Sequence, residues 1–572
     1  SVIVSESNCL TANQQLNAVM FTHRISNEYN PPNVNSGFIQ STFTTNYGTN
    51  WDSIILHSDQ VNFGRYPSGA IFNPVGNTDI NNAFATVSGP VTSVTSSWSG
   101  NLFSSAKLDH TNINPHVDIN GTSGVINQGY ARIGYTATDL KTIVTGGLFM
   151  NLNASTPLAQ GYHGATLNYA TPAANNTFTW SIDSIVPNFA TNNTGARQTY
   201  SVAQTAWNKA GNIGYVIFNG VEASIVDAGA KGYCPIVFKT TNAGLTWNQL
   251  PNFNFSTLPA IAATLQPSWN SSNNSYTGPP KAWFSQDKGY DCAVDQNGEL
   301  HIFSTIVSGF TMNDDSLGFT FTPSPLATSK ISYMFDTYTS GNTWGAVLVD
   351  SLLTENALDF SPFIDDVGSN YEIDARLQIS RSDDGSKLFY FWVDTYPNIN
   401  DLLENNLPNI FGKAYDVSTN LWSITKQFTT DNRNYFMYVS NLTLQSGTTY
   451  KVPVTVSLPV GWPSNVYTYN PFRHYFVSGI EFDESEFTIT STPQKTEKSS
   501  FSLSEFFPNP SNTKTSILLD LEKSSEVTID LYDAIGRKVD SINKGSFNEG
   551  KNHIISLNLE ENSLASRKYM SY

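Results

Sequence analysis

The chain has 572 residues, a formal net charge of −17 and a sequence pI of about 4.8. Charged residues make up 13% of it, against about 25% in typical soluble domains, and aromatic residues also reach 13%. The acidic balance, without a basic stripe, excludes nucleic acid as a partner. A surface solvated mainly by Asn, Ser and Thr favours repeated protein contacts.

The amino-terminal residues lack the basic and apolar regions of a signal peptide, so we expect Ser1 to be a mature start. No run of about 18 apolar residues occurs, and no membrane-spanning helix is expected. Cys9 does not stand at the terminus, where a lipid-bearing cysteine would be needed.

The body, from about residue 17 to 483, consists of short hydrophobic alternations separated by Asn, Gly, Ser and Thr turns, which predict an all-β fold. One device recurs in it: a strand, a hairpin of small polar residues, and a Trp that opens the next strand. Its copies end at Trp51, Trp247 and Trp344, and degenerate copies end at Trp98, Trp180 and Trp422. Segments 293–303 and 377–391 add strand patterns around a hairpin turn.

The hairpins at residues 44–51 and 240–247 resemble the Asp-box, Ser/Thr-x-Asp-x-Gly-x-Thr-Trp, with Asn in place of Asp. In such a hairpin the Asx side chain bonds the turn backbone, Gly takes a positive φ, and Trp anchors the hairpin. The resemblance implies a β-propeller over residues 1–490, with about seven blades and with six or eight as alternatives. The structural residues implied are Asn46, Gly48, Trp51, Asn242, Gly244 and Trp247.

Three cysteines leave two possibilities open. In the first, Cys234 and Cys292 form a disulfide and Cys9 is unpaired. In the second, all three are thiols. No Cys-x-x-Cys or paired-His spacing suggests zinc, and we expect neither a metal nor a cofactor.

An enzyme is the main alternative, because Asp-boxes also occur in sialidases, which hold the substrate carboxylate with three arginines. Residues 22–26 match the early sialidase Arg motif only weakly, and the arginines available for a clamp are Arg24, Arg132, Arg376 and Arg473. The acidic pairs at 314–315, 365–366 and 383–384 are typical of solvated turns. His110, His116, His163 and His301 lack the spacing of a triad or metal site, so no catalytic residue is assigned.

Five Asp-Ser-apolar sequences resemble the Asp-Ser/Thr-apolar motif that Bacteroidetes use for periplasmic O-glycosylation. Chance matches within Ser-rich strands are the alternative explanation. The serines concerned are Ser53, Ser184, Ser316, Ser351 and Ser541.

The last part of the chain differs from the body. Residues 491–506 are typical of a polar linker, and beyond them Ile517, Leu519 and Leu521 begin a period-two alternation that resumes at Val527. Several short strands of this kind predict a small immunoglobulin-like β-sandwich over residues 507–572.

The motifs of this segment resemble the type A C-terminal sorting domain of proteins exported by the type IX secretion system of Bacteroidetes. Arg567 stands where the family usually has Gly, two residues before the last family Tyr. The residues that carry the resemblance are Pro508, Asn509, Pro510, Leu531, Tyr532, Asp533, Gly536, Arg537, Gly550 and Tyr569.

The resemblance implies a protein that is secreted or held on the outer cell surface. It also implies that the C-terminal domain binds the type IX machinery, including its outer-membrane shuttle barrel. We therefore expect a non-catalytic β-propeller that acts in adhesion or in surface or filament assembly, with self-association or a surface glycan as its interaction. The alternative is a secreted propeller that binds or hydrolyses glycans in the manner of a sialidase.

Overall fold

The computed structural model describes two compact units, Ser1–Pro493 (unit 1) and Gln494–Tyr572 (unit 2). The division falls inside the segment expected to be a linker, residues 491–506, and the predicted domain boundaries stay predictions. The residues described are 7–26, 36–95, 98–119, 131–149, 161–193, 195–270, 272–309, 332–341, 343–354, 375–395, 405, 407–460, 471–490, 501–503, 514–521, 523–533, 538–558 and 569–570.

Unit 1 is all-β, as its alternating sequence predicts, and is built mainly of four-stranded antiparallel sheets whose strands follow one another in the chain. The first three sheets contain β1 (Leu10–Asn13), β2 (Ala18–Arg24), β3 (Ile39–Thr44) and β4 (Asp52–His57); β5 (Phe63–Gly64), β6 (Ser68–Phe72), β7 (Phe84–Thr92), β8 (Trp98–Lys107) and β9 (Val117–Ile119); and β10 (Ile133–Ala137), β11 (Thr142–Phe149), β12 (Tyr162–Ala173) and β13 (Thr177–Ile185).

The next three sheets repeat the pattern, and a two-stranded sheet lies in the chain between the fourth and the fifth. Their strands are β14 (Thr199–Trp207), β15 (Gly214–Gly220), β16 (Cys234–Thr240) and β17 (Asn248–Gln249); β18 (Ser268–Asn270) and β19 (Ser275–Gly278); β20 (Ala282–Val294), β21 (Leu300–Ser308), β22 (Tyr333–Ser340) and β23 (Thr343–Ser351); and β24 (Gln378–Arg381), β25 (Lys387–Asp394), β26 (Asn409–Asp416), β27 (Leu421–Trp422), β28 (Lys426–Gln427) and β35 (Ile489–Thr490).

Two three-stranded sheets end unit 1. They contain β29 (Tyr438–Val439), β32 (Val454–Pro459) and β33 (Phe472–Val477), and β30 (Leu444–Ser446), β31 (Thr449–Lys451) and β34 (Glu481–Asp483).

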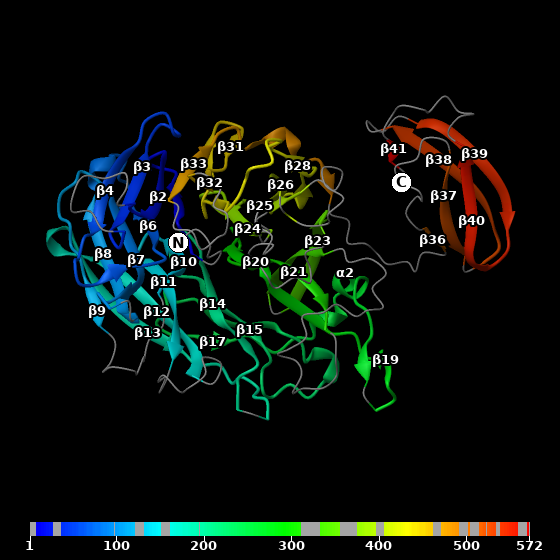
Figure 1. Ribbon diagram of the computed structural model, residues 1–572, viewed down its shortest axis with the longest axis horizontal. Coiled ribbons are helices and arrows are strands. Elements are labelled where there is room, and N and C mark those ends of the chain that lie inside the picture. The colour runs from blue at the N-terminus through cyan, green and yellow to red at the C-terminus, as the bar shows by residue number, and fades with distance from the viewer. Residues whose placement is uncertain are drawn as a thin grey trace. The chain divides into compact units, whose positions relative to one another are not determined.

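One strand from each successive sheet contacts the corresponding strand of the next. β1 contacts β6, β6 contacts β10, and the series continues through β14, β20, β24 and β29, which contacts β1 again. Figure 1 shows the sheets of unit 1 around a common centre, from blue through green to yellow in chain order. We call β1, β6, β10, β14, β20, β24 and β29 the innermost strands.

The hydrophobic core lies between neighbouring sheets. One cluster joins β2 and β3 to β7 and β8, and others join the third sheet to the fourth, the fourth to the fifth and the fifth to the sixth. A large cluster joins strands from both ends of unit 1, with Phe21 of β2, Phe389 of β25 and Tyr438 of β29 among its members. Full burial of one such side chain stabilises the fold by about 1.5–3 kcal/mol.

Several strands are buried along their whole length. Every residue of β7, β15 and β25 is buried, because each of these strands lies in a sheet covered on either side. The described helices are short, namely η1 (Ile80–Asn82), η2 (Ala174–Asn176), η3 (Ala228–Ala230), η4 (Phe255–Thr257), α2 (Pro259–Ala262) and η6 (Glu484–Glu486). None of the helices in the described part has the length and apolar composition that crossing a bilayer requires.

The recurring Trp residues lie within or directly before late strands of the sheets. Trp180, Trp344 and Trp422 lie within the fourth strands β13, β23 and β27, and Trp51 and Trp247 directly precede the fourth strands β4 and β17. Trp98 differs, since it begins β8, which precedes the last strand of its sheet, β9.

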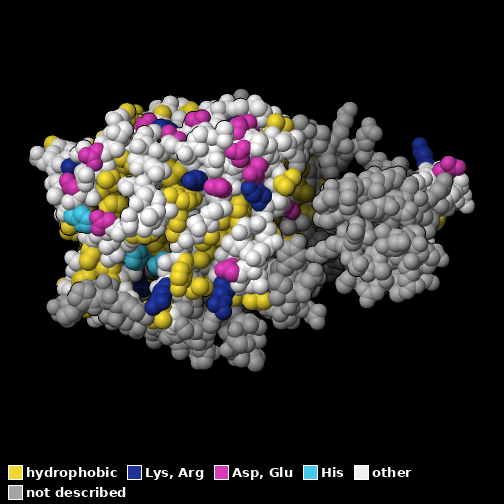
Figure 2. Space-filling view, turned by 90° about the horizontal axis from the view of Figure 1, so that it is seen from above, with side chains coloured by type: hydrophobic (Ala, Val, Ile, Leu, Met, Phe, Trp, Pro, Cys, Tyr) yellow, Lys and Arg dark blue, Asp and Glu magenta, His cyan; other side chains and the backbone are white. Residues whose placement is uncertain are grey.

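The innermost strands define two ends of unit 1. At one end, which we call the leading end, the innermost strands begin and the antiparallel second strand of each sheet finishes. For example, Thr22 near the end of β2 donates its N–H to the carbonyl of Cys9, just before β1. At the other, the hairpin end, each of β1, β6, β10, β14, β20 and β24 turns into its second strand. Figure 2 shows charged side chains singly or in small groups among uncharged polar and hydrophobic ones, as the composition predicts.

Unit 2 consists of two three-stranded antiparallel sheets in its described residues. Leu519 and Leu521 are buried, as the alternation predicts, and Ile555 on the paired strand is buried as well. The strands are β36 (Phe501–Leu503), β37 (Lys514–Leu521) and β40 (Gly550–Asn558), and β38 (Ser525–Asp533), β39 (Lys538–Phe547) and β41 (Tyr569–Met570).

Candidate functional site

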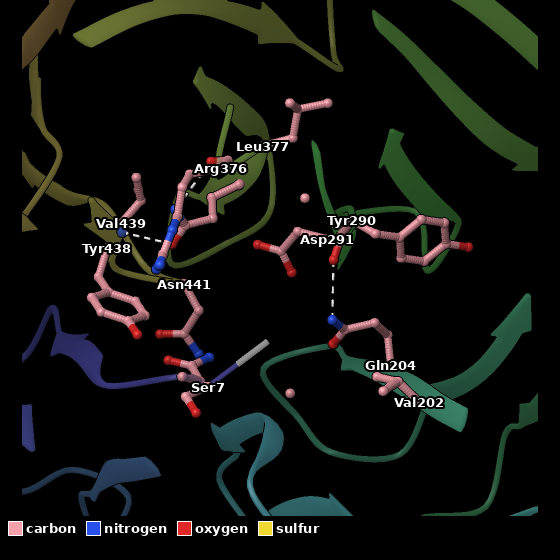
Figure 3. Close-up of a pocket in the computed structure, with 14 residues that line it drawn as sticks. Ser7, Val202, Gln204, Tyr290, Asp291, Arg376, Leu377, Tyr438, Val439 and Asn441 are labelled. Atoms are coloured by element: carbon pink, nitrogen blue, oxygen red, sulfur yellow. Dashed lines mark hydrogen bonds between the residues drawn. The ribbon is translucent and has the colours of Figure 1, made fainter. Parts of the chain in front are cut away.

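A small axial cavity lies between the innermost strands toward the leading end. Its volume is about 40 Å³, which is room for water or a small ion. Figure 3 shows its side chains around one space, with Asp291 on one side and Asn441 and Ser7 on another. Gln204 donates to the carbonyl of Tyr290 at 3.0 Å and so ties β14 to β20.

Arg376 is the cation among the residues that line this cavity, and only 2% of its surface is exposed. Its guanidinium carbon lies 5.2 Å from the ring centre of Tyr438 and 5.4 Å from that of Phe436. These cation–π contacts partly compensate the loss of water around the charge.

Asp291 is the buried acid of the cavity. Burial raises its pKa to about 7, although its carboxylate accepts backbone N–H groups of Ile379 at 3.0 Å and Cys292 at 2.8 Å. A carboxyl group that titrates near neutrality is a candidate for acid–base chemistry. Both oxygens, however, also hold the backbone of β20 and β24 in place.

Two larger polar grooves lie at the hairpin end, with volumes of about 270 and 310 Å³. Asp139, Lys209 and Arg381 line both of them, and Asp383 lines the first. We call these four residues the hairpin-end cluster. The grooves approach the size of small-ligand sites.

The hairpin-end cluster is internally paired. Lys209 forms an ion pair with Asp383, and Arg381 donates to the carbonyl oxygens of Ser382 and Asp383 at 3.0 and 2.9 Å. Burial raises the pKa of Asp139, an effect that the charge of Lys209 opposes and that of Asp383 reinforces.

Other carboxylates near the axis brace hairpin turns. Asp295 accepts the N–H groups of Asn297 and Glu299, both at 2.8 Å. Asp384 accepts the N–H of Ser386 at 3.0 Å and the hydroxyl of Ser382 at 2.7 Å. Against the effect of burial, the hydrogen bonds to Asp384 hold its pKa below the ordinary value, and the pKa of Asp295 is lowered first by the hydrogen bond and charge of His301 and then by the backbone N–H groups.

The two Asp-box-like hairpins share one hydrogen-bond pattern. Asn46 accepts the hydroxyl of Thr44 and the N–H of Asn50, both at 2.9 Å, and the N–H of Gly48 reaches the Thr44 hydroxyl at 3.1 Å. In the second hairpin, Asn242 accepts the hydroxyl of Thr240 at 2.9 Å and the N–H of Thr246 at 3.0 Å. The N–H of Gly244 reaches the Thr240 hydroxyl at 3.0 Å. Gly48 and Gly244 have φ values of 89° and 86°.

The tryptophans of these hairpins are anchored differently. Trp51 donates to the Gly48 carbonyl at 3.1 Å, whereas Trp247 packs edge-on against Trp207 at 5.6 Å between ring centres. The hairpin 382–387 has a related Ser–Asp–Gly pattern without a Trp, since Gly385 has a φ of 76° and the Lys387 N–H reaches the Ser382 hydroxyl at 2.9 Å. A search for Ser-x-Asp-Gly would have found it in the sequence.

The four arginines considered for an enzyme come from different elements of the described structure. Arg24 ends β2, Arg132 precedes β10, Arg376 lies in the axial cavity, and Arg473 lies on β33. The acidic pairs 314–315 and 365–366 lie outside the described residues.

The four histidines are separate too. His110 pairs with Asp52 at 2.8 Å and His116 with Asp118 at 3.0 Å, both at exposed positions, while His163 accepts a hydrogen bond from Arg197 at 3.0 Å. His301 is buried, with its Nδ1 2.8 Å from Asp336.

The three cysteines are free thiols, with Cys9 and Cys234 buried and Cys292 partly so. Within the described residues, no group of His, Cys, Asp or Glu is arranged to hold a metal ion.

Three of the O-glycosylation candidates share a local geometry. The N–H groups of Ser53, Ser184 and Ser351 each donate to the preceding Asp at 2.7–2.8 Å. Ser53 and Ser184 are exposed. Ser541 lies in β39, and Ser316 lies outside the described residues.

The predicted sorting residues are described in part. Leu531, Tyr532 and Asp533 end β38, Gly550 begins β40, and Tyr569 begins β41, where it is the register partner of Asp533. Pro508, Asn509, Pro510, Gly536 and Arg537 lie outside the described residues.

No protein-family model and no curated protein matches the chain. Among solved structures it is similar to the polysaccharide lyase Uly1, with 9% identity over 84% of this chain and 91% of that one and a TM-score of 0.41. It is also similar to Trypanosoma rangeli sialidase in complex with the inhibitor DANA, with 9% identity over 82% and 54% and a TM-score of 0.30. A putative glycoside hydrolase from Parabacteroides distasonis matches with 11% identity over 63% and 88% and a TM-score of 0.23.

Proposed function

We propose that this chain is a secreted, non-catalytic β-propeller that acts in adhesion or in surface or filament assembly, and that unit 2 directs its export through the type IX system. The non-catalytic assignment rests on one observation: the carboxylates near the axis already accept hydrogen bonds from backbone N–H groups or pair with cations. The binding surface is the hairpin-end cluster with the two grooves that it lines.

A propeller of seven blades is supported by the succession of contacts among the innermost strands. Seven such strands, each from a successive sheet, contact one another, and the last contacts the first. The core cluster that joins β2, β25 and β29 fits the same arrangement, because closure needs a hydrophobic contact between the first and last blades.

The absence of a catalytic role is supported by how the axial acids are used. A glycosidase needs two carboxyl groups that face the substrate about 5–9.5 Å apart. Asp295 and Asp384 instead brace turns, and Asp383 is occupied by Lys209 and by Gln15, which donates to it at 3.0 Å. Chemistry at these groups would first have to break contacts that hold the hairpins.

Export through unit 2 is supported by the antiparallel pairing of β38 with β41. The register brings Asp533 beside Tyr569, so two parts of the sorting motif that are far apart in sequence become neighbours. Deletion of residues 507–572 is expected to abolish surface display in a host with a working type IX system. Display of the truncated chain at the level of the full chain would contradict the proposal.

The adhesion or assembly role is tested on the purified full chain. We expect self-association in analytical ultracentrifugation or binding on a glycan array, without release of sugar products from any glycan bound. Product release with turnover would contradict the non-catalytic assignment.

A hydrolytic propeller is the second candidate, and Asp291 is the observation that favours it. Its pKa of about 7 suits a general acid. If this candidate holds, Asp291→Asn will abolish product release, while Asp183→Asn at an exposed carboxylate will not.

A further inference from the structure

Three arginines lie near Tyr66 at the leading end of the first three sheets. Arg24 ends β2, Arg65 directly follows β5, and Arg132 directly precedes β10. Tyr66 links them: the guanidinium of Arg132 lies over its ring at 4.9 Å, and its phenol interacts with the charges of Arg24 and Arg65. We call Arg24, Arg65 and Arg132 the arginine cluster.

The cluster concentrates positive charge in a strongly acidic chain. Burial, and next the nearby charge of Arg65, lower the pKa of Arg24 to about 10. In the described part of the chain, no ion pair with a carboxylate involves Arg24 or Arg65. Arg24 donates instead to the carbonyl and hydroxyl oxygens of Ser36, at 2.6 and 3.2 Å, and Arg65 donates to the carbonyl of Gly64 at 3.0 Å. An arrangement that brings like charges together costs stability unless something else requires it.

An aromatic surface lies beside the arginines. Tyr66 stacks on Trp98 with 6.1 Å between ring centres and 27° between planes. Trp98 is 40% exposed, so part of this large apolar ring faces solvent. Exposed aromatic faces next to guanidinium groups suit a ligand with both an apolar face and negative charge.

The backbone that presents Arg65 and Tyr66 is held under strain. Tyr66 has a φ of 40°, which is uncommon for a bulky residue. The segment packs so closely that a Cβ on Gly89 would lie 2.6 Å from the Arg65 carbonyl oxygen, and one on Gly37 would lie 2.5 Å from the Phe63 Cβ. Strained backbone fixed by its surroundings is typical of binding sites.

We propose that the arginine cluster, with Tyr66 and Trp98, forms a binding site for an acidic saccharide that carries carboxylate or sulfate groups. The guanidinium groups bind the anionic substituents through charge-assisted, bidentate hydrogen bonds. The sugar ring lies against the exposed face of Trp98. This site uses residues distinct from the axial cavity and the hairpin-end grooves, and it does not depend on the route of export.

The test is binding of the full chain to polygalacturonate, measured by isothermal titration calorimetry, with dextran as the neutral probe and polyphosphate as the non-saccharide anion. We expect binding to polygalacturonate that weakens as salt rises, and none to dextran. Arg65→Gln and Arg132→Gln are each expected to weaken it about ten- to hundred-fold, because a hydrogen bond to a charged group is worth about 1.5–3 kcal/mol. Arg433→Gln, at an exposed arginine outside the cluster, is the matched control and leaves the affinity unchanged.

Trp98→Ala separates a saccharide site from a general anion site. It is expected to weaken polygalacturonate binding and to leave any polyphosphate binding as it was. The proposal would be overturned if dextran bound as tightly as polygalacturonate, or if Arg433→Gln weakened binding as much as the cluster variants. It would also be overturned if polyphosphate bound as tightly as polygalacturonate and Trp98→Ala changed the affinity for neither. Circular dichroism of each variant confirms that the loss is not one of folding, and Arg65→Lys, which keeps the charge, is expected to retain part of the affinity.

Discussion

The hairpin-end cluster and the arginine cluster lie at opposite ends of the innermost strands and use charge in opposite ways. At the hairpin end two cations, Lys209 and Arg381, meet two acids, and the nearby acids Asp295 and Asp384 bond to turn backbone. At the leading end, three arginines lie near one tyrosine, Tyr66, namely Arg24, Arg65 and Arg132.

The difference separates charges of opposite sign that pair with one another from charges of like sign that repel one another. A paired carboxylate that also caps a turn is explained by the hairpin that it holds. Like charges gathered beside an exposed aromatic ring repel one another, and this repulsion is the feature from which we inferred an anionic ligand. Substitutions at the two ends should therefore change stability with different size and even different sign.

The largest expected effect belongs to the buried charge network next to the hairpin end. Asp336 is 1% exposed and accepts hydrogen bonds from His301 at 2.8 Å and Tyr390 at 2.9 Å. Asp336→Asn leaves the His301 charge buried without its closest partner and should lower the free energy of unfolding by about 3–5 kcal/mol. Urea denaturation measures the loss, with Asp183→Asn as an exposed control expected to change it by less than about 0.5 kcal/mol.

The same network makes stability depend on pH. Burial acts to lower the pKa of His301, but the charges of Asp336 and Asp295 raise it to about 9, above the value of about 6.5 in the unfolded chain. The stabilisation is therefore fully present below about pH 6.5 and is lost as pH rises through about 9. The difference in unfolding free energy between the native chain and His301→Gln should shrink over this range, and a constant difference would contradict the assignment.

Two glycines at the hairpin end allow a finer comparison. Gly385 has a φ of 76°, and a Cβ there would lie 2.7 Å from the Gln296 backbone nitrogen, whereas Gly76 has a φ of 80° with nothing within 4 Å. Gly76→Ala carries only the left-handed backbone cost of about 1–2 kcal/mol. Gly385→Ala adds a steric clash and should cost about 1–3 kcal/mol more. Equal losses in thermal or urea unfolding would show that the hairpin moves freely away from Gln296.

Much of the fold was accessible from sequence because its signals are local. The alternations predicted the all-β body, the short polar turns predicted hairpins, and the Asn and Gly of residues 44–51 and 240–247 lie where the turn geometry requires them. Trp98 was grouped with the other tryptophans, although it begins β8 rather than a last strand and supplies an exposed ring beside Tyr66.

The candidate sites were less accessible because they form from separate sheets. Arg24 and Arg132 were considered as parts of a sialidase clamp, but nothing in their spacing indicates that Arg65 and Tyr66 lie beside them. The pairing of Lys209 with Asp383, 174 positions later, likewise depends on the contact between distant innermost strands. The predicted sorting and glycosylation roles rest on motifs and stay predictions.

The ion pair of Lys209 and Asp383 should contribute little to stability despite its close contact. The two side chains are 37% and 25% exposed, so water screens their attraction. In a double-mutant cycle with Lys209→Gln and Asp383→Asn, we expect a coupling free energy of about 0–1 kcal/mol. A coupling energy well above this range would mean that the groove excludes water and that the pair belongs with the buried network around His301.

The arginine cluster should give the smallest effect, and one of opposite sign. Arg65→Gln removes a positive charge that acts on Arg24 and keeps a polar side chain at a half-exposed position, so relief of like-charge repulsion should leave stability unchanged or raise it by about 0.5 kcal/mol. The gain should fade at high salt, because screening already weakens the repulsion there. Thermal unfolding at low and high salt measures both. If Arg65→Gln instead destabilises the chain as much as a core substitution, the charge of Arg65 serves the fold, and the contrast between the two ends fails at the point where a ligand was inferred.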